Sequence, residues 1–487
     1  MMRLPALLFL ALVCAVAQAQ GARPGAGVGV VLQGVGQGLN QGLNGVGQGL
    51  GQGLNQGING VGQDLGTLPQ SVDDTLRGVE AGADTLLADV ARTAQSQALL
   101  RRNGKLLEAD PAGHPMVRGE VVAFAPTEAD LAAVQGEGFS VVATHALEGL
   151  ETRIVVLRAP QGMATATALT QLRALLPTVS FDFNHIYFRS GEPAVTAGAS
   201  VAQGARAAAA VPAAGAVAQD PAAAPAAMAA ADAVRVGLID GGIDAAHPAF
   251  HSRSIQHHGC NGALIPDPHG TAVASLLVGQ AGAFRGAAAG ASLYAADVYC
   301  GRPDGGAVDA VADALSWLVR ERVPVINVSL VGPPDATLEA VVRLVVARGF
   351  ILVAAVGNDG PAAPPMYPAS WPGVVGVTAV DAHRHALLEA ARGPQVHFAA
   401  PGADMVAARS PHAFGRVRGT SFASPLVAGL LALQLHEPGV PAAVAAVAQL
   451  ERQAQHPGNV DPDPVYGRGI VGMDLAPALR LASLQVQ

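Results

Sequence analysis

The stretch that decides the fold reads Gly419-Thr420-Ser421-Phe422-Ala423-Ser424-Pro425. The apolar run that follows it, from Leu426 to Leu433, predicts a buried helix. Ser421 therefore stands at a helix N-terminus, where unpaired backbone N–H groups and the positive end of the helix dipole favour a developing negative charge. By itself this pattern is more typical of an ordinary helix cap than of a nucleophile, so other segments must decide between the two.

Three further residues stand at the ends of predicted elements. Asp240 ends a short apolar strand, His269 begins a helix of small residues, and Asn358 ends another apolar strand. Each of them alone is typical of a turn or a cap. Together with Ser421 they supply a nucleophile, a base, a carboxylate to orient the base, and an amide donor for an oxyanion. The four residues therefore predict an acyl-transfer site.

From residue 232 onwards, apolar strands alternate with helices. The predicted strands are Val234–Ile239, Ala291–Val298, Val325–Leu330, Ile351–Val356 and Gly373–Val380, and the predicted helices are Ala272–Leu277, Val308–Val319 and Leu338–Ala347. This alternation predicts an α/β fold whose mostly parallel sheet carries helices on both faces. Sites in such sheets collect at the carboxyl ends of the strands, which is where these residues stand.

The segments around Asp240, His269, Asn358 and Ser421 resemble those of the subtilisin-like (subtilase) serine proteases. The chain order Asp, His, Ser is also that of this family. Tyr466-Gly467-Arg468-Gly469 resembles its closing segment, and the resemblance covers roughly residues 232–480. It implies a subtilisin-like fold and peptide-bond hydrolysis through an acyl-enzyme. In that reaction Ser421 is the nucleophile, His269 the base, Asp240 its orienting carboxylate and Asn358 an oxyanion-hole donor.

The resemblance also implies a binding site for an extended peptide. The segment Ile326–Leu330 is similar to the family's substrate-lining strand, so Ser329, Leu330 and Val331 are candidate substrate-binding residues. Val331 stands where the family usually has glycine. This predicts a narrower pocket for the substrate residue that precedes the cleaved bond. Gly241 replaces the usual Ser or Thr after the catalytic aspartate, which removes one local hydrogen bond. The chemistry requires no cofactor, and no calcium-binding loop of the family can be matched, so no metal is assigned.

The first half of the chain has a different organisation. Residues 1–19 carry Arg3, an apolar core and an Ala-Gln-Ala cleavage signal, which predicts a secretory signal peptide rather than a membrane anchor. Residues 20–116 hold irregular Gly-Val-Gly-Gln and Gln-Gly-Leu-Asn repeats, typical of a flexible spacer, and then an amphipathic helix at 72–90. Surface attachment or self-association of the repeats is the alternative.

Residues 117–190 predict a small ferredoxin-like α+β module with the order βαββαβ. Its elements are strands at Glu120–Ala125, Phe139–Ala146, Arg153–Arg158 and Val179–Phe188, with helices from Thr127 and over Thr165–Leu176. An Ala/Pro-rich linker at 191–231 separates it from the catalytic domain at 232–487. Subtilases often carry a prodomain of this size and order, so the resemblance implies an inhibitory partner within the chain; an accessory domain is the alternative.

Composition narrows the remaining choices. The net charge of −8 and the lack of any basic stripe argue against nucleic acid as a partner. Beyond the N-terminus there is no run long and apolar enough to predict a membrane span. Cys260 and Cys300 remain after signal-peptide removal and suggest one disulfide, with two buried thiols as the alternative. The expected product is a secreted serine endopeptidase made as a precursor. The competing class is a non-catalytic exported protein that binds peptides on the same scaffold.

Overall fold

The computed structural model describes residues 95–189, 234–251, 253–409, 412–457 and 462–476. All of them belong to one compact unit, residues 78–487. The predicted signal peptide, glycine-rich repeats, amphipathic helix at 72–90 and Ala/Pro-rich linker lie outside the described residues. None of the helices that are described is long and apolar enough to cross a lipid bilayer.

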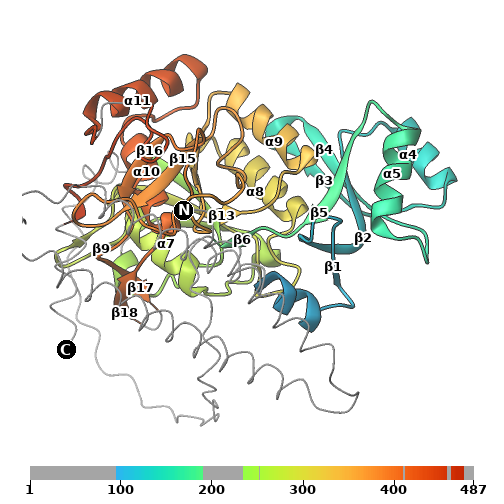
Figure 1. Cartoon of the computed structure of the whole chain (residues 1–487), viewed down its shortest axis with the longest axis horizontal. Helices are drawn as coiled ribbons and strands as arrows, with labels where there is room; N and C mark the ends of the chain where they lie inside the picture. Colours follow the sequence, from blue (N-terminus) through green and yellow to red (C-terminus); the bar gives the residue numbers. More distant parts are fainter. Residues whose placement is uncertain (1–94, 190–233, 252, 410–411, 458–461, 477–487) are drawn as a thin grey trace, which may run out of the picture. The chain divides into compact units, whose positions relative to one another are not determined.

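A parallel sheet organises the C-terminal part of the described chain (Figure 1). Its strand order is β16-β15-β14-β12-β7-β11-β8, seven strands among the described residues, and each neighbouring pair is parallel. The bounds are β7 Arg235–Asp240, β8 Ile255–His258, β11 Ser292–Asp297, β12 Val325–Val328, β14 Ile351–Ala355, β15 Val375–Val380 and β16 Phe398–Pro401. The predicted α/β fold with a mostly parallel sheet is confirmed.

Helices cover both faces of this sheet because its strands are apolar on both sides. On β14, Val353 packs with α7 (Pro268–Val278) and α10 (Thr420–Ala432), whereas the preceding residue, Leu352, packs with α8 (Val308–Arg320) and α9 (Ala336–Ala347). Alternate residues of a strand point to opposite faces, so one apolar run supplies both cores. The helix α11 (Val440–Gln453) packs against α10, and β17 (Met405–Arg409) pairs with β18 (Ala413–Val417).

The ferredoxin-like module has the predicted order β2 (Pro115–Phe124), α4 (Glu128–Gly136), β3 (Ser140–Leu147), β4 (Thr152–Arg158), α5 (Thr165–Leu175) and β5 (Ser180–His185). Its antiparallel sheet runs β5-β2-β4-β3, and the short strand β1 (Leu107–Ala109) is added along β2. The predicted start of α4 is confirmed: Thr127 and Asp130 form a reciprocal capping box. The predicted closing strand Val179–Phe188 is wrong as one element, because it breaks after His185 and resumes as β6 (Phe188–Arg189).

The two faces of the module's sheet have different partners. Val121 packs on the module's own helices α4 and α5, while Val122, which points the opposite way, packs with α8 and α9. A buried polar contact accompanies this packing: His185 Nδ1 lies 2.9 Å from Asp335 Oδ2, and Nε2 lies 3.3 Å from Asp110 Oδ2. Burial opposes the charged ring, but the hydrogen bonds to Asp110 and Asp335 raise the pKa of His185 to about 9. At neutral pH a buried cation therefore joins the module to the start of α9.

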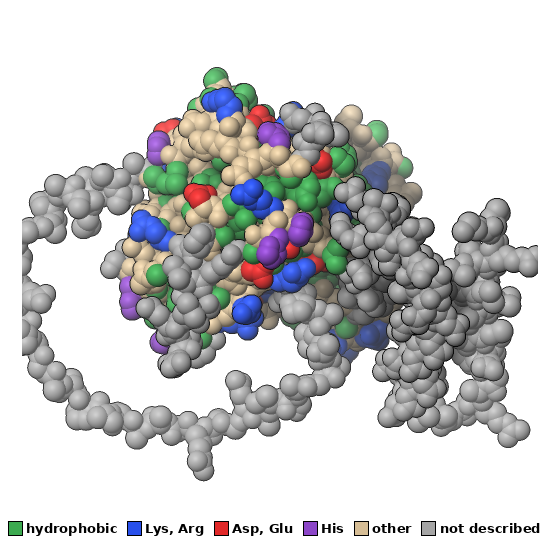
Figure 2. Space-filling model, turned by 60° about the vertical axis from the view of Figure 1, so that its left-hand side comes forward, with side chains coloured by type: hydrophobic (Ala, Val, Ile, Leu, Met, Phe, Trp, Pro, Cys, Tyr) green, Lys and Arg blue, Asp and Glu red, His purple; other side chains and the backbone are tan. Residues whose placement is uncertain are grey.

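Figure 2 shows acidic, basic and histidine side chains interspersed over the face that it draws. Among the side chains that the figure colours by type, Lys and Arg lie between acidic and histidine side chains.

The close contact of the module with α8 depends on Gly149, in the turn η1 (Glu148–Leu150). A Cβ at this position would lie 2.3 Å from the backbone oxygen of Ser316 and 2.6 Å from the backbone nitrogen of Arg320. We expect Gly149→Ala to destabilise the full chain by about 1–3 kcal/mol, because two backbones must move apart. Thermal unfolding of the full chain, with Ser421→Ala in every sample to exclude self-cleavage, measures this change.

Gly136→Ala is the matched control for this prediction, since a Cβ at the end of α4 meets no atom within 4 Å. It should leave the unfolding midpoint within about a degree of the parent, because surface substitutions change stability little. Equal midpoints for Gly149→Ala and Gly136→Ala would show that the described packing on α8 is not present in solution.

Candidate active site

Three elements bring the predicted residues together at the carboxyl end of the sheet. Asp240 is the last residue of β7, His269 is the second residue of α7, and Ser421 is the second residue of α10. β7 lies in the interior of the sheet, between β12 and β11, so Asp240 is fully buried. α7 and α10 pack against each other over the same face, which brings the residues that they carry near the end of β7.

The contact between Asp240 and His269 is the main polar contact of the site. His269 Nδ1 lies 2.9 Å from Oδ1 and 2.9 Å from Oδ2 of Asp240. A carboxylate without a proton can only accept, so Nδ1 donates and Nε2 is the nitrogen that can take up a proton. The buried carboxylate therefore sets both the orientation and the tautomer of the ring.

The start of α10 lies close to this ring. The ring centroids of His269 and Phe422, the residue after Ser421, are 5.5 Å apart. Ser421 is fully buried, and no hydrogen bond to its Oγ is present within the described part of the chain. A serine hydroxyl used as a cap would bond a backbone N–H of the first turn, so this arrangement favours the nucleophile over the cap.

Asn358 follows β14 and turns its amide toward the start of α10. The backbone N–H of Thr420 donates to Asn358 Oδ1 over 2.9 Å. The carbonyl end of the amide therefore points to the start of α10, and the NH₂ group is the donor end of the side chain. That is the orientation in which an asparagine can donate to an oxyanion.

The predicted substrate-binding residues divide into two groups. Ser329 is buried beneath α10, where its Oγ lies 3.2 Å from the backbone oxygen of Ser421 and 3.1 Å from Ser424 Oγ. Leu330 and Val331 form a separate short strand, β13, which pairs antiparallel with β6. The expected single strand Val325–Leu330 is therefore wrong: the chain leaves the parallel sheet after Val328, and the following residues pair with another segment.

The segment that pairs with β13 comes from the chain's own N-terminal half. In the register of this pair, Leu330 lies opposite Arg189 and Val331 opposite Phe188. Tyr187, just before β6, is 1% exposed; its hydroxyl donates to Pro333 O over 2.8 Å. Its backbone oxygen accepts from the hydroxyl of Tyr299 over 2.9 Å. An extended peptide therefore already lies along the strand that the sequence predicted would bind one.

Sequence reasoning missed four residues of this region: Tyr187, Arg189, Asp267 and Tyr299. For Asp267 a signal existed, because an acidic residue directly before a proline is typical of a helix start. The structure confirms that role, since Asp267 Oδ1 accepts from the backbone N–H groups of His269 and Gly270. No local pattern marks the other three residues: Tyr187 and Arg189 reach the site through the docking of the module, and Tyr299 comes from the loop after β11.

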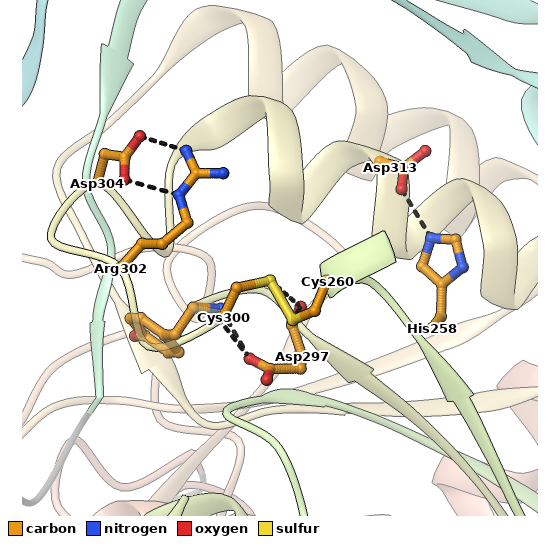
Figure 3. Close-up of a disulfide and its surroundings, with 8 residues drawn as sticks. His258, Cys260, Asp297, Cys300, Arg302, Asp304 and Asp313 are labelled. Atoms are coloured by element: carbon orange, nitrogen blue, oxygen red, sulfur yellow. Dashed lines mark hydrogen bonds and ion pairs between the residues drawn. A yellow bond between two sulfur atoms is a disulfide. The ribbon is translucent and has the colours of Figure 1, made fainter. Parts of the chain in front are cut away.

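Cys260 and Cys300 form a disulfide, with Cα atoms 5.2 Å apart (Figure 3). It ties the loop after β8 to the loop after β11. Beside it, Asp297 Oδ1 accepts from the backbone N–H groups of Tyr299 and Cys300, each over 2.9 Å. The loop that carries Tyr299 is thus held by a covalent bond and by a carboxylate.

Two groups of described side chains bring three possible metal ligands within 4.8 Å of one another. In the first, Cys260 and Cys300 already share their disulfide beside Asp297. In the second, His185 bonds to Asp335, and the backbone N–H of Ala336 donates to Asp182 Oδ2. The two sulfurs of the first group are bonded to each other, and the side chains of the second already share hydrogen bonds with each other or with the backbone, so we assign no metal ion to either group.

Comparison with known proteins agrees with this geometry. The Subtilase family matches residues 231–455 of the chain. Subtilisin DY of Bacillus licheniformis is 30% identical over 257 residues, which cover 50% of this chain and 90% of that protein. Subtilisin E of Bacillus subtilis (strain 168) is 31% identical over 252 residues, 50% of this chain and 65% of that protein. The chain thus spans slightly less than two thirds of subtilisin E.

A solved structure extends the likeness of the fold. It is the structure of fervidolysin from Fervidobacterium pennivorans, described as a keratinolytic enzyme related to subtilisin. The two folds align over 76% of this chain and 62% of the fervidolysin chain, with a TM-score of 0.58. Its sequence identity is 18%, so this likeness concerns the fold alone. The fold and the site define a subtilisin-like α/β protein. The chain belongs to the subtilase family.

The pKa of His269 is raised above its ordinary value. Burial disfavours the charged ring and lowers the pKa, but the negative charge of Asp240 and the hydrogen bond to it outweigh burial. Among weaker influences, the charge of Arg189 lowers this pKa and that of Asp267 raises it. A base with a raised pKa stays protonated to a higher pH, so a reaction that needs the neutral ring is lost as the pH falls through that value.

We therefore expect kcat/KM for peptide hydrolysis to rise with pH, with the midpoint of the acid limb above the ordinary histidine value of about 6.5. Initial rates at low substrate concentration, measured between pH 5 and pH 10, give the profile. His383→Ala, which removes an exposed histidine, should leave the profile unchanged. An acid limb centred at or below about 6.5 would contradict the dominant influence of Asp240 on His269.

Proposed function

We propose that the chain is an exported serine endopeptidase, made as a precursor, that hydrolyses peptide bonds through Asp240, His269 and Ser421. The observation that carries the proposal is the paired contact of His269 Nδ1 with both oxygens of the buried Asp240, together with a serine at the start of the adjoining helix α10 whose Oγ has no hydrogen bond within the described residues. Membership of the subtilase family supports it.

The reaction follows from the positions of these groups. Ser421 Oγ attacks the carbonyl carbon of the substrate while His269 Nε2 takes the hydroxyl proton, and Asp240 stabilises the imidazolium that forms. The oxyanion receives hydrogen bonds from Asn358 and from the backbone N–H of Ser421 at the start of α10. His269 then gives its proton to the leaving amine. Water attacks the acyl-enzyme with His269 again as base, which releases the acid and restores Ser421.

The precursor part of the proposal rests on the pairing of β6 with β13. Residues 187–189 lie where an extended substrate would pair, and they follow directly from the ferredoxin-like module. The module would therefore act as a prodomain that blocks the cleft until the chain is cut after it. The docking of Val122 and the rest of that sheet face on α8 and α9 would hold this blocking segment in place. Export would follow from the signal peptide expected at residues 1–19.

Ser421→Ala tests the assignment of the nucleophile. We expect this variant to keep its unfolding midpoint and to lose peptide hydrolysis by on the order of 10⁴-fold or more. The parent, but not the variant, should also react covalently with a fluorophosphonate probe. Ser254→Ala is the control, because Ser254 is exposed and takes part in none of the contacts described for the site. A parent that neither reacts nor cleaves would favour the non-catalytic peptide-binding protein.

A second proposal concerns the substrate residue whose carbonyl is attacked, at what is called here the carbonyl position. We propose that Val331 limits the size of the side chain that fits there. A valine in place of glycine narrows this pocket, so we expect alanine there to be cleaved at least about tenfold faster than phenylalanine in kcat/KM. Val331→Gly should reduce that ratio toward one while the reaction of Ser421 with the fluorophosphonate probe stays unchanged. Equal cleavage of the two peptides by the parent would contradict the proposal.

A further inference from the structure

The register of β6 on β13 says which substrate position Arg189 represents. Leu330 lies opposite Arg189, and the two strands are antiparallel. If a substrate pairs with β13 in the same register, the residue after its counterpart of Arg189 therefore lies opposite Ser329. The hydroxyl of Ser329 lies 3.2 Å from the backbone oxygen of Ser421. A substrate in this register therefore presents to Ser421 the carbonyl of the residue opposite Ser329. Arg189 marks the position one residue before it, called here the preceding position.

The carboxylate of Asp267 contacts Arg189 with a fixed geometry. Asp267 Oδ1 accepts from the backbone N–H groups of His269 and Gly270 over 2.9 and 3.1 Å, which holds the side chain at the start of α7. Oδ2 points away from the helix and lies 2.5 Å from Nη2 of Arg189. The side chains of Arg189 and Asp267 are only 20% and 18% exposed. A charge-assisted hydrogen bond that is partly shielded from water and made by an already oriented acceptor is of the stronger kind.

Tyr299 forms the opposite wall of this position. The guanidinium carbon of Arg189 lies 4.0 Å from the centroid of the Tyr299 ring, within the range of a cation–π contact. The disulfide of the neighbouring Cys300 (Figure 3) and the hydrogen bond that the Tyr299 backbone N–H donates to Asp297 Oδ1 hold the backbone that carries this ring. The carboxylate of Asp297 is also close enough for the positive charge of Arg189 to lower its pKa, although burial raises that pKa overall.

Gly241 makes room for the carboxylate. A Cβ at Gly241 would lie 2.6 Å from Cγ and 2.7 Å from Cβ of Asp267. The serine or threonine expected at this position from the family resemblance would therefore displace Asp267 from its present place. The glycine at position 241, which departs from the family pattern, is therefore what allows the carboxylate of Asp267 to lie in its present place.

We propose that this cleft selects arginine at the preceding position, through Asp267 on one side and the ring of Tyr299 on the other. The same contacts bind the chain's own Arg189 and an arginine in other peptides. The inference rests on the proposed endopeptidase function, which it extends by naming a class of substrate. These substrates are peptides in which arginine stands one residue before the residue whose carbonyl is attacked.

The test compares active enzyme on four peptides that differ only at the preceding position, with Arg, Lys, Ala or Glu. Rates are measured on the plateau of the pH profile, because the charge of Asp267 also influences the pKa of His269. We expect kcat/KM for Arg to exceed that for Ala by about 10- to 100-fold, with Glu the poorest. In Asp267→Asn the preference for Arg over Ala should fall to about threefold or less. Asparagine caps helices as well as aspartate, so α7 keeps its start.

Two variants at Tyr299 separate its ring from its hydroxyl. Tyr299→Phe keeps the ring and loses only the hydroxyl that bonds the backbone of the bound peptide. It should slow all four peptides by a similar factor and keep the preference for Arg. Tyr299→Leu removes the ring, so it should lower kcat/KM for the Arg peptide by about threefold or more relative to the Ala peptide.

The outcomes separate the inference from the proposed function. Cleavage by the parent without a preference for Arg, or a preference that survives in Asp267→Asn, would overturn the inference and leave the endopeptidase proposal standing. Absence of cleavage of every peptide, together with no reaction of Ser421 with a fluorophosphonate probe, would overturn the endopeptidase proposal and the inference with it.

Discussion

The hydrogen bonds between Asp240 and His269 are the contact on which the site depends. A carboxylate buried at the end of an interior strand needs a partner, because an unpaired charge there would strongly oppose folding. His269 provides that partner only if α7 begins at the right place, which Asp267 ensures by capping the helix. α7 then packs against α10, which carries Ser421. A single electrostatic requirement thus links the end of β7 to the starts of two helices.

The cleft of this chain is shaped for an extended peptide that the chain itself contains. Tyr187 fills a buried position beside Gly332, where a Cβ would lie 2.6 Å from its ring. Arg189 lies between Asp267 and Tyr299, and β6 pairs with β13. The face of the module's sheet that carries Val122 packs on α8 and α9. The segment in the cleft is therefore also held through the module that precedes it in the chain. The N-terminal half therefore contacts the rest of the chain both within the cleft, through residues 187–189, and outside it, through the packing of the module's sheet.

Local sequence patterns predicted most of the fold because buried parallel strands are continuous apolar runs. They failed where the signal is weak: β8 (Ile255–His258) is a partly exposed edge strand of mixed polarity, β16 is four residues long and ends in Pro401, and α11 has only Ala446 and Leu450 buried. Asp240, His269, Asn358 and Ser421 could be named from their places at the ends of elements. Whether their atoms meet could not, since those distances depend on how four separate elements pack.

The sequence by itself determined the class of fold, the order of the main elements of the module and the candidate reactive residues, because these depend on periodicity and on short motifs. Only the tertiary structure decided that the chain's own residues 187–189 lie along β13 and that Ser329 supports the start of α10. The same holds for the pairing of Arg189 with Asp267, which are 78 residues apart in the sequence. Contacts of that separation follow from the docking of one module on another, which no local pattern encodes.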